Sequence, residues 1–185
     1  MPALRTRLLA VLAVVAATAL AGCAPADATP PTPTPTLEPV FASDEEALAA
    51  AIAAYEAYQN ASSEISSEGG TEPERIAATV TDEYSALLIE EFVGLQERAL
   101  RTEGTASFDS ASLADYFASD DESEVSVYLC RDIGEVRVID ASGADVTPTA
   151  RTERTPLLVH LVGSVDDPAI LLISAIEPWS GDSFC

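Results

Sequence analysis

The stretch Val125-Ser126-Val127-Tyr128-Leu129-Cys130 alternates apolar side chains with polar or amphipathic ones, which is the two-residue period of a β-strand with one buried face. Residues 135–140 show a similar alternation, and turn-forming residues follow at 141–144. Residues 157–163 and 169–176 are strongly apolar, with the turn sequence Asp166-Asp167-Pro168 between them. Weaker strand candidates lie at 105–108 and 113–117. These segments predict an antiparallel meander.

In the residues that precede this meander, the apolar side chains recur at the spacing of α-helices. Ser43 and Glu46 form a capping box that predicts a helix from Asp44 to about Ser62. A short helix is expected over 73–78, after Pro73, and a second long amphipathic helix from Thr81 to a stop at Gly104. Helices followed by antiparallel strands predict an α+β domain with its helices packed on one face of the sheet.

This order of elements resembles the NTF2-like, cone-shaped α+β fold. Two stretches, Val127-Tyr128-Leu129-Cys130-Arg131-Asp132 and Val136-Arg137-Val138-Ile139-Asp140-Ala141-Ser142-Gly143, also resemble a group of actinobacterial lipoproteins. The resemblance covers Asp44 to Cys185 and implies helices on a curved sheet, with a strand cysteine bonded to one near the C-terminus. The first hairpin of the family is not visible, so a cystatin-like or other α+β sandwich is the alternative.

The N-terminal residues have the features of an export signal. Arg5 and Arg7 precede an apolar run from Leu8 that is too short to span a bilayer. The run closes on Leu20-Ala21-Gly22-Cys23, which resembles a bacterial lipobox, in which the cysteine receives a diacylglycerol and becomes the first mature residue. Residues 1–22 are therefore expected to be a signal peptide, and Cys23 the lipid anchor on the extracytoplasmic face of the cell membrane. The alternative is an ordinary cleaved signal.

Residues 23–39 are predicted to be a disordered linker. Its centre, Thr29-Pro30-Pro31-Thr32-Pro33-Thr34-Pro35-Thr36, favours extended polyproline II conformation. The threonines are either glycosylated or bare. The folded domain is expected to occupy residues 40–185.

The charge of the chain excludes one class of partner. Its formal net charge is −22, from 31 acidic and nine basic residues, and it has no lysine. Such a surface repels phosphate backbones and anionic lipid headgroups, so no nucleic-acid partner is expected. Arginine without lysine, together with much alanine, suggests GC-rich coding and an actinobacterial source.

Three cysteines remain to be assigned. If Cys23 carries lipid, Cys130 and Cys185 are left as a pair outside the cytoplasm, where disulfides persist. Two free thiols are the alternative. No metal site is expected, because two cysteines and the distant His160 make no ligand cluster.

Four residues are candidates for a ligand pocket: Tyr55, Tyr84, Asp115 and Tyr116. Enzymes of the NTF2-like fold place a carboxylate and a tyrosine inside the cone, so the resemblance implies this possibility. Both helical tyrosines also suit plain core positions, and the alternation of the strand can send Asp115 to water. His160 is flanked by Val159 and Leu161, which predicts that it points out of the core.

No catalytic residue is assigned, and no cofactor is expected. The sequence has no Gly-x-Ser-x-Gly motif and no phosphate-binding glycine loop. The leading hypothesis is a non-enzymatic, membrane-anchored binding domain of the cell envelope whose partner is an envelope protein or a small apolar ligand. The alternatives are a ligand carrier and a cone enzyme related to ketosteroid isomerases and polyketide cyclases.

Overall fold

The computed structural model of the chain describes residues 39–119 and 122–185. The predicted signal peptide, Cys23, the linker up to residue 38 and the acidic pair Asp120-Asp121 lie outside the described residues. The described elements all belong to one compact unit, Leu37–Cys185. No helix within the described ranges is both long and apolar enough to cross a bilayer.

The first long helix, α2, spans Asp44–Ser67. Its capping box forms as predicted, because the backbone N–H of Glu46 donates to Oγ of Ser43 at 3.2 Å. The Glu46 carboxylate in turn accepts from the backbone N–H of Ala42 at 2.8 Å. The helix runs past the predicted end near Ser62 and stops before Gly69 and Gly70, whose φ angles of 70° and 82° are left-handed.

A 3₁₀-helix, η1, spans Pro73–Ala78, and the helix α3 spans Asp82–Glu97. The prediction that this second long helix continues to Gly104 is wrong. Ala99 has a φ of 51°, which breaks the helix. Strand β1 then begins at Arg101 and runs to Glu103, and its pairing with a distant strand takes the place of helical hydrogen bonds.

The main sheet has four antiparallel strands in the order β2-β3-β5-β6. Their bounds are Ser107–Ala118 (β2), Ser123–Asp132 (β3), Arg154–Gly163 (β5) and Leu171–Pro178 (β6). The two weak strand candidates form one strand, β2, whose register shifts between Asp109 and Ser112 and again between Leu113 and Asp115. The segment predicted at 135–140 shortens to β4, Arg137–Ile139, which leaves the sheet and pairs with β1.

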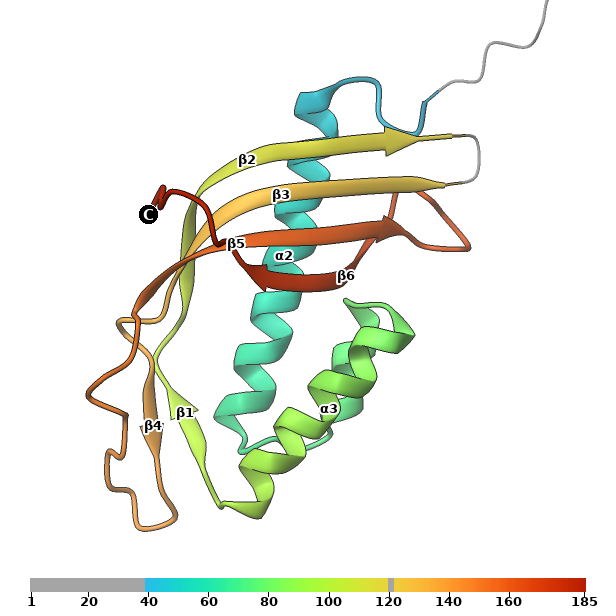
Figure 1. Ribbon diagram of the computed structural model, residues 1–185. Coiled ribbons are helices and arrows are strands. Elements are labelled where there is room, and N and C mark those ends of the chain that lie inside the picture. Colours follow the sequence, from blue (N-terminus) through green and yellow to red (C-terminus); the bar gives the residue numbers. More distant parts are fainter. Residues whose placement is uncertain (1–38, 120–121) are drawn as a thin grey trace, which may run out of the picture. The chain divides into compact units, whose positions relative to one another are not determined.

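Helix α2 crosses one face of the curved sheet, and α3 lies beside it (Figure 1). The core is formed where they meet. Helix α2 contributes the buried residues Ala47, Ala51, Tyr55 and Ile65. The sheet contributes alternate residues of β3 and β5, namely Val125, Val127, Leu129, Leu157, Val159 and Leu161. The predicted α+β architecture, with helices on a curved antiparallel sheet, is confirmed.

Gly70 allows the turn after α2 to lie directly against α3. A Cβ atom at this position would lie 2.1 Å from the carbonyl oxygen of Phe92. The backbone N–H of Gly70 donates to the carbonyl of Ile65 at 2.8 Å, which closes the end of α2. The spacing of the two long helices is thus set by backbone contact at this glycine.

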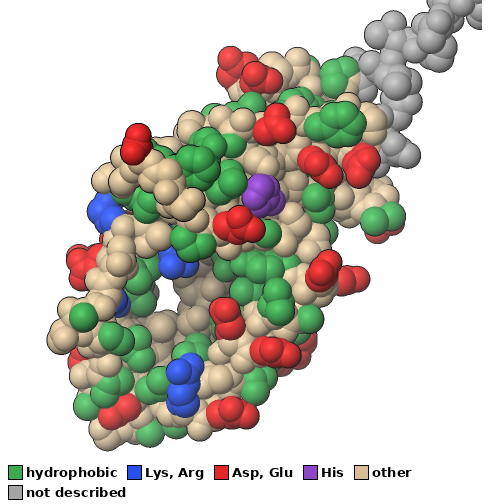
Figure 2. Space-filling view, in the orientation of Figure 1, with side chains coloured by type: hydrophobic (Ala, Val, Ile, Leu, Met, Phe, Trp, Pro, Cys, Tyr) green, Lys and Arg blue, Asp and Glu red, His purple; other side chains and the backbone are tan. Residues whose placement is uncertain are grey.

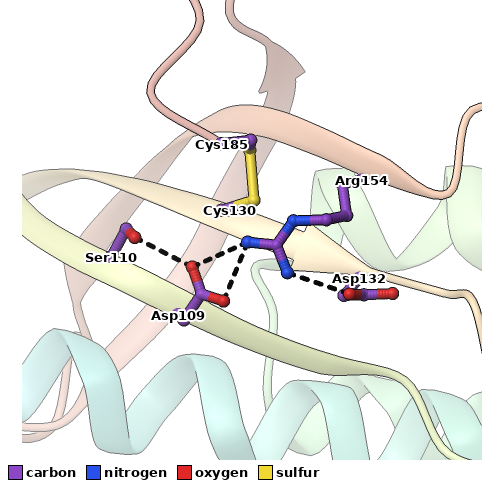
Figure 3. The surroundings of a disulfide bond; sticks show 6 residues. All are labelled: Asp109, Ser110, Cys130, Asp132, Arg154 and Cys185. Carbon is purple, nitrogen blue, oxygen red and sulfur yellow. Dashed lines mark hydrogen bonds and ion pairs between the residues drawn. A yellow bond between two sulfur atoms is a disulfide. The ribbon is translucent and has the colours of Figure 1, made fainter.

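The opposite face of the sheet is partly covered by the C-terminal segment. Cys130 and Cys185 form the predicted disulfide, with Cα atoms 5.4 Å apart (Figure 3). Trp179 and Phe184 lie edge-on against the Tyr128 ring, at centroid distances of 4.9 and 5.7 Å. The disulfide therefore holds an aromatic cluster on this face.

An ion-pair cluster crosses three strands beside the disulfide. Arg154 of β5 bonds both carboxylate oxygens of Asp109, at 3.1 and 2.9 Å, and one of Asp132, at 2.9 Å (Figure 3). Bonding from Arg154 lowers the pKa of Asp109. The pKa of Asp132 is lowered mainly by the backbone N–H of Gly134 and then by Arg154. These contacts tie β2, β3 and β5 together at one end of the sheet.

Cys185→Ser tests the contribution of the disulfide to stability. The sequence separation between the bonded cysteines is 55 residues. The chain-entropy model predicts a loss of about 4 kcal/mol in the free energy of unfolding for a loop of this size. Urea unfolding of the oxidised chain and the variant measures this loss. Reduced wild-type protein is the control and should match the variant; equal stability of all three would contradict the prediction.

Candidate functional site

The inward alternation of β3 brings an arginine into the space between sheet and helices. Val125, Val127 and Leu129 are buried on the inner face, and Arg131 is the next residue on the same side of the strand. Its side chain lines two neighbouring cavities, which also share Tyr58, Ser62 and Ser66 of α2. Arg131 therefore lies where the two cavities meet.

The smaller cavity, of about 170 Å³, lies between α2 and the strand ends. Its lining includes Tyr55, Gln59, Gly104 and Val136. The larger, of about 510 Å³, opens along α3, where Leu88, Phe92 and Leu95 provide an apolar wall. The surface is hollowed between the strands and the helices in the space-filling view (Figure 2). The volume of the larger cavity suits a small organic ligand.

Two buried polar atoms at this site have no hydrogen-bond partner among the described residues: Nε of Arg131 and Oε1 of Gln59. The Gln59 amide is held by its other end, since Nε2 donates to the carbonyl of Ala106 at 2.7 Å. An unsatisfied buried polar atom costs about 1–3 kcal/mol, and more when it carries charge. A ligand that bonds to these atoms would recover part of that cost.

Three tyrosines are grouped around Arg131. Burial raises the pKa of Tyr55 to about 12. Burial also raises the pKa of Tyr58 and of Tyr84. The positive charge of Arg131 lowers the pKa of all three and so partly offsets the effect of burial. The hydroxyls stay protonated at neutral pH, so those of Tyr55 and Tyr58, which line the cavities, can donate hydrogen bonds to a bound ligand.

Among the described residues that line the two cavities, the acidic ones are at the rim of the larger cavity. Glu90 and Glu91 of α3 line its mouth, and both are exposed. Among the described residues that line either cavity, none is a buried carboxylate. The described lining thus offers hydrogen-bond donors and a cation, and its carboxylates are at the exposed rim.

The four predicted pocket residues separate into two groups. Tyr55 lines the smaller cavity, and Tyr84 interacts electrostatically with Tyr55, Tyr58 and Arg131. Asp115 and Tyr116 instead line a separate shallow hollow beside Leu48, near the start of α2. Leu48 and Tyr58 are about 15 Å apart along the helix axis.

Tyr116 has a structural role. Its hydroxyl accepts from the backbone N–H of Phe41 at 3.0 Å and donates to the carbonyl of the same residue at 3.3 Å. Its ring also packs on the Phe41 ring, at a centroid distance of 5.7 Å. Tyr116 therefore holds the segment before α2 against the edge strand β2.

His160 lies on the outer face of the sheet, as predicted, since its neighbours Val159 and Leu161 are buried. Its Nδ1 is 2.9 Å from Oγ of Ser126, the residue opposite it on β3. In the described part of the chain no group of three or more His, Cys, Asp or Glu side chains is placed to hold a metal ion.

Sequence reasoning missed Arg131 and Gln59. A signal for Arg131 was present, because the alternation that buries Val127 and Leu129 continues to residue 131 and predicts an arginine on the inner face. Gln59 is on α2, four residues after Tyr55 and so on the same side of the helix. That its Oε1 lacks a partner depends on the tertiary packing.

A larger cleft of about 770 Å³ lies elsewhere, between the ends of the two long helices and the turn after β4. Its lining includes Glu68, Gln96, Arg101 and Asp140. Arg101 is paired with Glu103 at 2.7 Å, and Asp140 accepts hydrogen bonds from Ser142 and Ala144. Its charged groups are satisfied within the protein, so this cleft is the weaker candidate site.

Comparison with known proteins gives a likeness of fold. No protein-family model matches the chain, and no curated protein matches it. The crystal structure of the intermembrane space region of chloroplast protein ARC6 is similar, with a TM-score of 0.52, 9% identity, and coverage of 72% of this chain and 97% of that one. A structure from the actinobacterium Catenulispora acidiphila is more distant, with a TM-score of 0.41 and 17% identity over 70% of this chain and 92% of that one.

Alkaline titration tests the electrostatics of the site. Of the five tyrosines in the chain, Tyr55, Tyr58 and Tyr84 should ionise above pH 10, with Tyr55 near pH 12. Unfolded tyrosines ionise near pH 10, so the free energy of unfolding should fall as the pH rises above this value. Arg131→Gln should raise the three pKa values further, because the positive charge is removed.

Ultraviolet absorbance of tyrosinate measures the titration, and circular dichroism verifies that the protein is still folded. Arg154→Gln is the matched control, because Arg154 does not act on these tyrosines. Ionisation of all five tyrosines near pH 10 in the folded protein would contradict the assignment.

Proposed function

We propose that this protein is a lipid-anchored binding domain of the bacterial cell envelope, with an NTF2-like cone that takes up a small ligand. Cys23 carries the lipid, and residues 24–39 form the tether that connects the anchor to the domain. The net charge of −22 disfavours contact with anionic lipid headgroups, so the tether holds the domain away from the membrane surface.

One observation supports ligand binding above all others. Nε of Arg131 and Oε1 of Gln59 are buried with no hydrogen-bond partner in the described part of the chain, and each residue lines at least one of the two adjoining cavities. Buried polar groups in native proteins are nearly always satisfied, by the protein itself, by ordered water or by a bound group. The cavity and the unsatisfied atoms thus support the same role.

Binding accounts for this lining better than catalysis does. The described lining combines tyrosine and serine hydroxyls with an apolar wall on α3, and its carboxylates are at the exposed rim. An isomerase or cyclase of this fold would need a carboxylate inside the cavity as general base. We therefore propose a receptor or carrier role rather than an enzymatic one.

The anchor is tested by Cys23→Ser in the full chain. A serine cannot form the thioether to diacylglycerol, so the variant should leave the membrane fraction, whereas Cys185→Ser should remain in it. Membrane fractionation followed by intact-mass measurement checks both variants. A Cys23→Ser variant that still sediments with membranes, or a wild-type protein without the mass of the lipid, would contradict the anchor.

The cavity is tested by Ser62→Trp. Ser62 lines both cavities, so an indole there should fill the space at which they meet and block the ligand. Ala57→Trp, at an exposed position of the same helix, is the matched control. Native mass spectrometry after incubation with an envelope extract should show a small molecule retained by wild type and Ala57→Trp and lost from Ser62→Trp. Retention by all three, or by none, would contradict binding at this site.

A further inference from the structure

We infer that the ligand is a small amphipathic monocarboxylate whose carboxylate binds Arg131 and whose apolar body lies against α3. This inference rests on the proposed function, because it requires that the cavity binds a ligand. It adds the chemical class of that ligand and the residue that selects it.

The pairing of the arginines singles out this cavity. The structure describes seven arginines, and five of them form ion pairs with acidic side chains: Arg75, Arg101, Arg137, Arg151 and Arg154. The two described arginines without an ion pair, Arg98 and Arg131, line the same cavity. Nε of Arg98 donates to the carbonyl of Gly94 at 2.7 Å, so that guanidinium is fixed at the rim.

An unpaired guanidinium is unexpected in this chain. Acidic residues outnumber basic ones 31 to nine, so an acidic neighbour is available for almost any arginine. Within the described ranges Arg131 nevertheless has no ion pair or hydrogen bond with any of them, and its Nε is buried. A buried donor without a partner is unfavourable, and an oxyanion is the partner that fits the planar donor fork of arginine.

The surroundings favour a single negative charge. Glu90 and Glu91 at the mouth offset Arg98 and Arg131 within the lining, and the chain as a whole is strongly negative. A doubly charged phosphate would therefore meet greater repulsion than a carboxylate would. The hydroxyls of Tyr58 and Ser66 can donate to the remaining lone pairs of the carboxylate.

The wall of the larger cavity determines the rest of the ligand. Leu88 and Phe92 are buried residues of α3, and Leu95 is partly buried beside them. All three line the same cavity as Arg131, so a molecule that contacts both the apolar wall and the arginine needs an acidic head and an apolar body. A volume of about 510 Å³ limits it to a small molecule.

The test compares probes that share one apolar body. Octanoate, octanamide and octylammonium are titrated by isothermal calorimetry into the full chain carrying Cys23→Ser, which keeps lipid out of the preparation. The chain with an unaltered cavity should bind octanoate at least about tenfold more tightly than octanamide, and it should bind octylammonium most weakly. Arg131→Gln should abolish the preference for octanoate and leave the affinity for octanamide within about twofold. Arg154→Gln, which removes an arginine outside the cavity, should keep the preference.

Circular dichroism verifies the fold of each variant. Arg131→Lys gives a second test, because lysine keeps the positive charge but lacks the planar donor fork of arginine. This variant should retain only part of the preference for octanoate over octanamide. Equal binding of octanoate and octanamide, both lost in Ser62→Trp, would overturn the carboxylate inference and leave the proposed binding function intact. A further outcome would overturn both the carboxylate inference and the proposed binding function. In that outcome none of the three probes binds, neither hexanoate nor decanoate binds, and no molecule is retained from the envelope extract.

Discussion

The close packing of α2 on the inner face of the sheet is the constraint on which the rest of the domain depends. Ala47 and Ala51 are fully buried on this helix, and their small side chains let its first half lie near strands whose inner faces carry valine and leucine. Tyr55 and Tyr58 follow these alanines along the helix, and from Tyr55 to Ser66 the helix lines the smaller cavity. The same helix therefore closes the core at one end and forms a wall of the binding site at the other.

Backbone contact determines how the second helix closes the site. Gly70 has a left-handed φ, and the carbonyl of Phe92 occupies the space that a Cβ would need, so the turn after α2 and the middle of α3 cannot move closer or accept a side chain between them. The apolar wall formed by Leu88, Phe92 and Leu95 is held at this spacing. On the opposite face of the sheet, the disulfide and the Arg154 cluster fix the strands from the other side. The cavities thus lie between the helices and a sheet whose strands are tied together by these contacts.

The charge distribution explains why one arginine can define this site. Most described arginines are paired with nearby carboxylates on the surface, where each pair contributes little to stability because solvent screens it. Arg131 is half-buried among tyrosines whose burial favours their neutral form, and no described carboxylate forms an ion pair with it. A cation that the fold leaves unpaired in an acidic protein marks a place where a complementary group from outside the chain can bind.

Much of the fold was predictable from local patterns, because these depend on neighbouring residues. Alternation gave the strands and the outward position of His160, the Ser43 and Glu46 pair gave the start of α2, and the cysteine count gave the disulfide. The end of α3 and the departure of β4 from the sheet were not predictable, since both follow from the pairing of β1 with β4, segments more than 30 residues apart.

The candidate site was likewise predictable only in part. The alternation of the strand was enough to predict that residue 131 faces inward. Only the tertiary structure decided that Arg131 has no ion-pair partner among the described residues, that Gln59 joins it, and that Asp115 and Tyr116 lie elsewhere. The physical reason is that the distances between side chains of different elements are set by how helices and sheet pack.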